Sequence, residues 1–93
     1  MRERWFGATG RLVPELALEG DASVPLEQAL VLHDVSDEEA LRAAHEAGRP
    51  VVVHADSAEA VKRALARPEV ASVLVPEAKR ELLELDLTEL TYG

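Results

Sequence analysis

The sequence contains no cysteine, and this absence excludes several kinds of protein chemistry. Without a thiol the chain can form no disulfide bond, no thiolate zinc site and no cysteine nucleophile. Aromatic residues are also few: Trp5, Phe6 and Tyr92, all near the ends of the chain. The core between them must therefore be aliphatic. Adjacent strand residues point to opposite faces, so one of Trp5 and Phe6 can enter the core, and all three aromatic residues are candidates for a subunit interface.

Long apolar runs and clusters of basic residues are lacking as well. No apolar stretch approaches the ~20 residues that a membrane helix needs, and residues 1–10 carry no signal-peptide pattern. The net charge is −8, and the acidic residues are spread along the chain. Phosphate and anionic membranes attract clustered Lys and Arg, which this chain does not have. We therefore expect a cytoplasmic protein that binds neither nucleic acid nor a membrane.

Motifs of known chemistry are equally sparse. The chain has no glycine-rich dinucleotide-binding turn, no phosphate-binding loop and no Gly-x-Ser-x-Gly turn. His45-Glu46 lacks the second histidine of a zinc-protease helix. The chain also has no Asn and a single Gln, which is typical of a thermophilic source. We expect no organic cofactor, and the sequence favours a non-catalytic role while leaving enzymatic activity open.

What the chain does have is a series of strand–helix units. Its 93 residues, 47% of them hydrophobic, suit one domain spanning 1–93. Short apolar runs at about 29–34, 50–55 and 71–75 predict buried strands. Their alternation with helices favours parallel pairing and right-handed crossovers. The predicted fold is α/β: a small mixed sheet with three central parallel strands in βαβαβ order, flanked by antiparallel terminal strands, with two to three helices packed on it.

Capping residues predict where these helices begin and end. Ser36 and Glu39 have the spacing of a capping box, and Gly48 supplies a C-terminal stop for the first helix. Asp56 or Ser57 is expected to cap the second helix. Each predicted helix therefore begins immediately after a predicted strand.

The ends of the chain are less regular. Residues 4–8 and 11–18 are compatible with two strands joined at a turn, with Pro14 forcing an edge position or a break. A short helix is expected from about 76 to 82. The alternation that follows favours a final strand, but residues 83–91 could also continue as a helix.

The most suggestive side chains are two histidines at the carboxyl ends of predicted strands. His33 and His54 should point to the same face, roughly 5 Å apart, if their strands are neighbours. Ligands of open α/β sheets bind at this edge. His33, Asp34, His54 and Asp56 are thus candidate ligand-binding residues, and His33, His54 and Asp56 could hold a divalent metal. In the alternative interpretation, the two aspartates only cap helices and the histidines have no ligand.

These observations leave two functional hypotheses. The first is a non-catalytic interaction or assembly domain that forms a homo-oligomer, with a dimer as the expected form. The second is a small-ligand or divalent-metal-binding protein, hydrolytic in one version, with its site at the carboxyl ends of the parallel strands. Geometry separates them, because imidazoles more than about 8 Å apart, or on opposite faces, cannot share an ion at zinc–nitrogen distances of about 2.0–2.1 Å.

Overall fold

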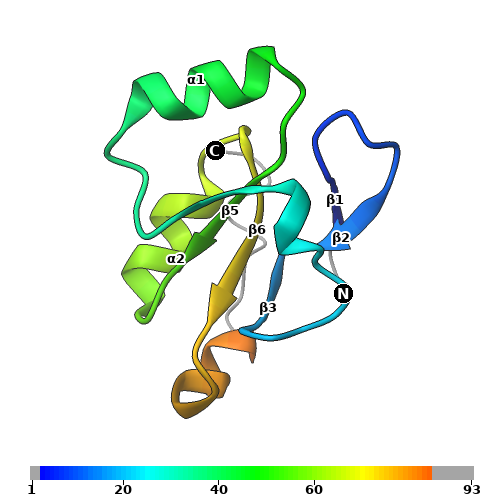
Figure 1. Cartoon of the computed structure of the whole chain (residues 1–93). Helices are drawn as coiled ribbons and strands as arrows, with labels where there is room; N and C mark the ends of the chain where they lie inside the picture. The colour runs from blue at the N-terminus through cyan, green and yellow to red at the C-terminus, as the bar shows by residue number, and fades with distance from the viewer. Residues whose placement is uncertain (1–2, 85–93) are drawn as a thin grey trace.

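The computed structural model describes residues 3–84 and contains a four-stranded parallel sheet (Figure 1). Its strand order is β3 (Leu16–Leu18), β6 (Val70–Val75), β5 (Val51–His54) and β4 (Leu30–Leu32). All three neighbouring pairs are parallel. The predicted α/β class is therefore confirmed, and the three predicted parallel strands lie side by side as β4, β5 and β6.

The antiparallel strands form a hairpin of their own. Strand β1 (Glu3–Trp5) pairs with β2 (Leu12–Pro14) as a separate two-stranded sheet. The next strand, β3, does not continue this hairpin but lies parallel to β6, so the main sheet has four parallel strands rather than three. The break falls directly after Pro14, because proline has no N–H group to donate to a neighbouring strand.

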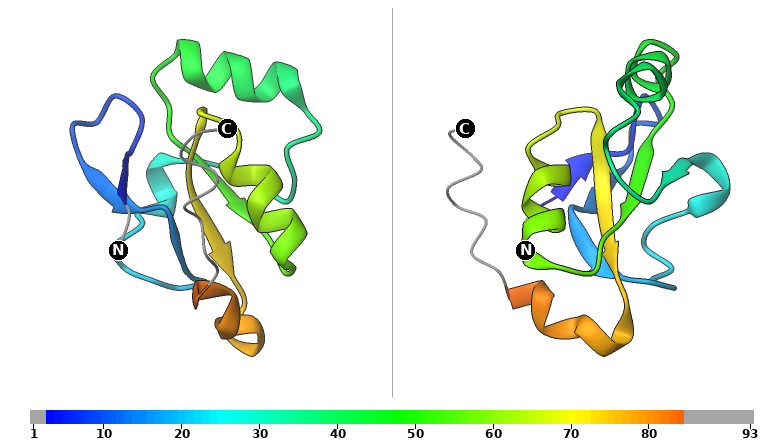
Figure 2. Two further views of the ribbon diagram at one scale, coloured as in Figure 1. Left: turned by 180° about the vertical axis from the view of Figure 1, so that it is seen from behind. Right: turned by 90° about the vertical axis from the view of Figure 1, so that its left-hand side faces the viewer.

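Two α-helices provide the crossovers of the sheet. Helix α1 (Glu38–Glu46) connects β4 to β5, and α2 (Ala58–Leu65) connects β5 to β6. Both contribute buried side chains to one core cluster on one face of the sheet. Helix α2 and the β1–β2 hairpin lie on opposite sides of β5 and β6 (Figures 1 and 2). In the described part of the chain, no helix has the length and apolar character to cross a membrane.

The start of α1 corrects one expectation. Its N-cap is Asp37, whose carboxylate accepts a hydrogen bond from the Ala40 amide at 3.0 Å. The predicted capping box of Ser36 and Glu39 is wrong, because the helix begins one residue later than expected; the Ser36 hydroxyl donates to Asp34 at 2.6 Å. At α2 the expected cap is present as Ser57, which accepts from the amide three residues later at 3.1 Å.

Two 3-10 helices complete the described elements. One, η1 (Leu26–Gln28), precedes β4, and the other, η2 (Glu77–Glu84), follows β6 at the position of the predicted third helix. The backbone of η2 is kinked at Lys79, so it is not a continuous α-helix. The predicted terminal strand falls mostly outside the described residues, as does Tyr92.

Side chains alternate between the two faces of the sheet, so each face has its own core cluster. Val51 and Val53 of β5 belong to the cluster on the helical side, whereas Val52 belongs to a second cluster that includes residues of the hairpin. Phe6 is fully buried in that second cluster, while the adjacent Trp5 remains 62% exposed. One of the two aromatic residues thus enters the core, as expected for neighbours on an extended segment.

A partly buried arginine ties the hairpin to the end of α2. The Arg4 guanidinium lies 2.9 Å from the Glu15 carboxylate, whose side chain is only 4% exposed. The same guanidinium donates to the carbonyls of Leu65, Arg67 and Val70 at 2.6, 3.3 and 3.0 Å. A cation at a helix C-terminus also interacts favourably with the helix dipole. Arg4 therefore connects three segments that are distant in the sequence.

Candidate functional site

The two predicted histidines lie next to each other at the carboxyl edge of the sheet. Strands β4 and β5 pair in a register that places Leu32 beside Val53, so His33 follows beside His54. Their ring centroids are 5.3 Å apart, and the planes are stacked with an angle of 28° between them. Both rings are therefore on the same face and well within the 8 Å at which a shared ion becomes impossible.

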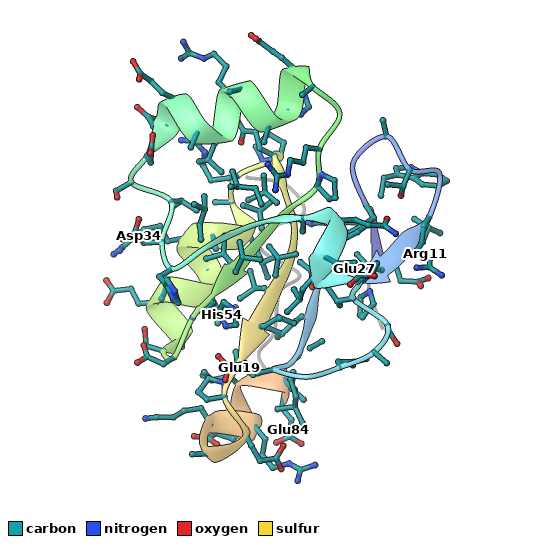
Figure 3. The ribbon with its side chains drawn as sticks, in the orientation of Figure 1. Arg11, Glu19, Glu27, Asp34, His54 and Glu84 are labelled. Atoms are coloured by element: carbon teal, nitrogen blue, oxygen red, sulfur yellow. The ribbon has the colours of Figure 1, made fainter. Side chains whose placement is uncertain are left out.

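A third residue, Glu19, joins this pair. It follows β3, and its backbone amide donates to the Val75 carbonyl at 2.9 Å, which continues the parallel pairing with β6. Its carboxylate reaches past β6 and lies 2.7 Å from the Nδ1 atom of His54 (Figure 3). An ionised carboxylate can only accept, so it favours the tautomer in which Nδ1 carries the proton and Nε2 keeps its lone pair.

The imidazoles border a depression of about 340 Å³ at the carboxyl ends of the strands. Its lining comprises Glu19, His33, His54, Ala55, Asp56, Ala60 and Pro76. The lining contains two imidazoles and two carboxylates but no Lys or Arg side chain. Coulombic attraction at this site therefore favours a cation over an anion.

The four predicted site residues are not all equivalent. Asp56 lines the depression with the two histidines, but Asp34 does not. The Asp34 carboxylate accepts from the Ser36 hydroxyl and from the Ser36 amide, and these two hydrogen bonds hold its pKa below the ordinary value. Asp34 therefore belongs to a tight turn before α1, and we assign it no contact with a ligand.

The metal hypothesis needs a further distinction. Across residues 3–84, no group of three His, Asp or Glu side chains is arranged to hold a metal ion. His33, His54 and Asp56 are thus neighbours in one depression but are not assembled as a three-ligand centre. What the geometry offers is a pair of imidazole donors with nearby carboxylates.

Glu19 was missed by reasoning from the sequence alone. It stands directly after its strand, as His33 stands directly after β4, and that position was the only available signal. The signal had no meaning without knowing that β3 lies parallel in the main sheet. Glu19 is therefore recognised only from the tertiary pairing of β3 with β6.

The candidate interface residues have different surroundings. Trp5 is largely exposed and lies opposite Leu12 in the hairpin register, where Leu12 is exposed as well. Phe6 is a core residue and offers no surface. Trp5 also borders a second groove of about 280 Å³, together with His45 of α1 and Glu69. Among the described residues, the other large exposed apolar side chains are Val31 on β4 and Leu83 in η2.

Fold and site together define a small α/β domain with a histidine-lined depression at the carboxyl edge of its parallel sheet. Comparison with known proteins finds no matching family model, no matching curated protein and no matching solved structure.

Proposed function

We propose that this protein binds a divalent transition-metal ion through His33 and His54. The observation that carries the proposal is the 5.3 Å separation of the two ring centroids inside one depression. With zinc–nitrogen bonds of about 2.0–2.1 Å and tetrahedral angles, the centroids of two ligating imidazoles are separated by about 5 Å. His33 is exposed and His54 is partly buried, so each ring can turn to direct a nitrogen at the shared ion.

The contact between Glu19 and His54 supports the same chemistry. Metal-binding histidines commonly donate their other ring N–H to a carboxylate, which fixes the tautomer and makes the ligating nitrogen more basic. Imidazole donors suit zinc, copper and nickel ions. Two protein donors leave coordination positions for water or a small ligand, with Asp56 as the second carboxylate of the lining beside Glu19.

The test is calorimetric titration of the untagged protein with zinc chloride. We expect one zinc ion per chain, and His33→Ala or His54→Ala should each raise the dissociation constant at least tenfold. Glu19→Gln should raise it about tenfold, the lower end of the effect of such supporting carboxylates.

The matched control is His45→Ala, since His45 is exposed on α1 and does not line the depression. Its zinc affinity should equal that of the wild type. Unchanged binding in the His33 and His54 variants, or an equal loss in the His45 variant, would contradict a site at the strand ends.

A second candidate function is assembly of the chain into a homo-oligomer without catalysis. It is favoured by four large apolar side chains that remain exposed among the described residues: Trp5, Leu12, Val31 and Leu83. Exposed apolar groups that lie close together mark sites of association. A cytoplasmic location fits both candidates and is part of the proposal, supported by a sequence without cysteine.

A further inference from the structure

Strand β4 forms one edge of the main sheet. In the part of the chain that the structure describes, β5 is its only neighbouring strand. The Leu30 amide donates to the Pro50 carbonyl at 2.9 Å, toward β5. Backbone groups of successive strand residues point in opposite directions, so the N–H and C=O of Val31 point away from the sheet. The opposite edge differs, because η2 lies beside β3 and buries Leu82 in the core.

This edge has only some of the features that usually prevent strands from pairing between molecules: β4 is three residues long, and the Arg49 guanidinium donates to the Ala29 carbonyl at 3.3 Å. Proteins protect edge strands by keeping them very short or with charged side chains, prolines or bulges. Residues 28–33 contain no Asp, Glu, Lys, Arg or Pro, although the whole chain carries a net charge of −8. The pairing of β4 with β5 is regular, without a bulge, and Val31 is 38% exposed.

We propose that β4 pairs with β4 of a second copy of this chain, antiparallel and about a two-fold axis at Val31. The inference rests on the second candidate function, assembly, and identifies its surface. Val31 would exchange both backbone hydrogen bonds with its own counterpart, and Leu30 would lie opposite Leu32 of the other copy. The two four-stranded sheets would become one sheet of eight strands.

The lack of charge along β4 and the symmetry of its apolar side chains favour a second copy as the occupant of this edge. Two chains of net charge −8 repel each other wherever their acidic side chains meet. The uncharged stretch 28–33 is a place where two identical acidic chains can approach without that cost. Its apolar side chains are also self-complementary, since each leucine of β4 meets a leucine of the other copy.

The test is the mass in solution over a series of protein concentrations, measured by sedimentation velocity in the presence of EDTA. EDTA removes metal ions that could bridge two copies through His33. We expect a monomer–dimer equilibrium for the wild type. Val31→Lys should raise the dimer dissociation constant at least tenfold, because it places like charges directly opposite each other. The exposed position of Val31 lets the lysine reach solvent, and circular dichroism checks the fold.

Leu12→Lys is the matched control, since Leu12 is an exposed apolar residue on the hairpin. It should dimerise like the wild type. A wild type that stays monomeric at every concentration would overturn both assembly and the edge pairing. Undiminished dimerisation of Val31→Lys would overturn the edge pairing alone, and a selective loss in Leu12→Lys would move the interface to the hairpin.

Discussion

Replacement of Arg4 by alanine should destabilise the fold by about 3 kcal/mol. The substitution removes the guanidinium from a Glu15 carboxylate that is 4% exposed, and it removes three hydrogen bonds to backbone carbonyls near the end of α2. Removing one partner of a buried ion pair typically costs about 3–5 kcal/mol. Because the Arg4 side chain is itself 22% exposed, the lower end of that range applies.

The assay is urea unfolding followed by circular dichroism. A domain of this size has a total stability of roughly 5–14 kcal/mol, so the variant should still fold. With a urea slope of about 1 kcal/mol/M, the midpoint should fall by about 3 M. The unfolding midpoint of Arg4→Lys should lie between those of the wild type and Arg4→Ala. An ammonium group keeps the charge but cannot contact a carboxylate and several carbonyls in one plane.

A surface ion pair provides the reference for this experiment. Arg63 lies 3.9 Å from Glu59 one helical turn away, and both side chains are largely exposed. Arg63→Ala should therefore cost less than about 0.5 kcal/mol. If Arg4→Ala proves no more costly than Arg63→Ala, the reasoning that Arg4 fastens the hairpin to α2 is refuted.

Two further substitutions test other parts of the fold. Gly7→Ala should lower the melting temperature more than Gly10→Ala. Both glycines have positive φ, but only at Gly7 would a Cβ lie 2.5 Å from the Gly48 carbonyl oxygen. Equal decreases in melting temperature would contradict close packing at Gly7. Burial raises the pKa of Glu69, but hydrogen bonds from its own amide and from Arg67 outweigh burial, so its pKa lies below the ordinary value. Such a group stabilises the fold above its unfolded pKa and loses this effect as pH falls through the folded value. Glu69→Gln should therefore cost about 1 kcal/mol at pH 7 and progressively less in acid, as measured by urea unfolding; a constant difference would count against the ion pair.

The parallel strands were predictable because their signals are local. Runs such as residues 51–53 are continuously apolar, as strands buried on both faces must be, and β4 and β5 are each followed by a capped helix. Strand β3 has no such signal. It is three residues long, it follows the hairpin without an intervening helix, and its partner β6 lies at the other end of the sequence. Only tertiary packing selects that pairing.

The candidate site was predictable to the same extent. His33 and His54 could be placed together because they stand at the carboxyl ends of two strands, β4 and β5, whose parallel arrangement was predicted correctly. Glu19 could not, since its position depends on β3. The sequence places the cap of α1 one residue too early for a related reason: Ser36 and Asp37 are both residue types that cap helices, and only the structure shows that Ser36 belongs to the turn formed by Asp34.

The proposed ion site and the proposed dimer edge use neighbouring residues but separate groups. Leu30 and Leu32 pack against the helical-side cluster, so Val31 and His33 both lie on the other face of β4. In a two-fold pair centred on Val31, the His33 residues of the two copies would be displaced in opposite directions, by two residues each. At about 3.4 Å per residue they would lie roughly 14 Å apart, too far to share an ion through bonds of about 2 Å. Each depression would thus keep its own pair of imidazoles, and zinc binding would neither require the dimer nor be blocked by it.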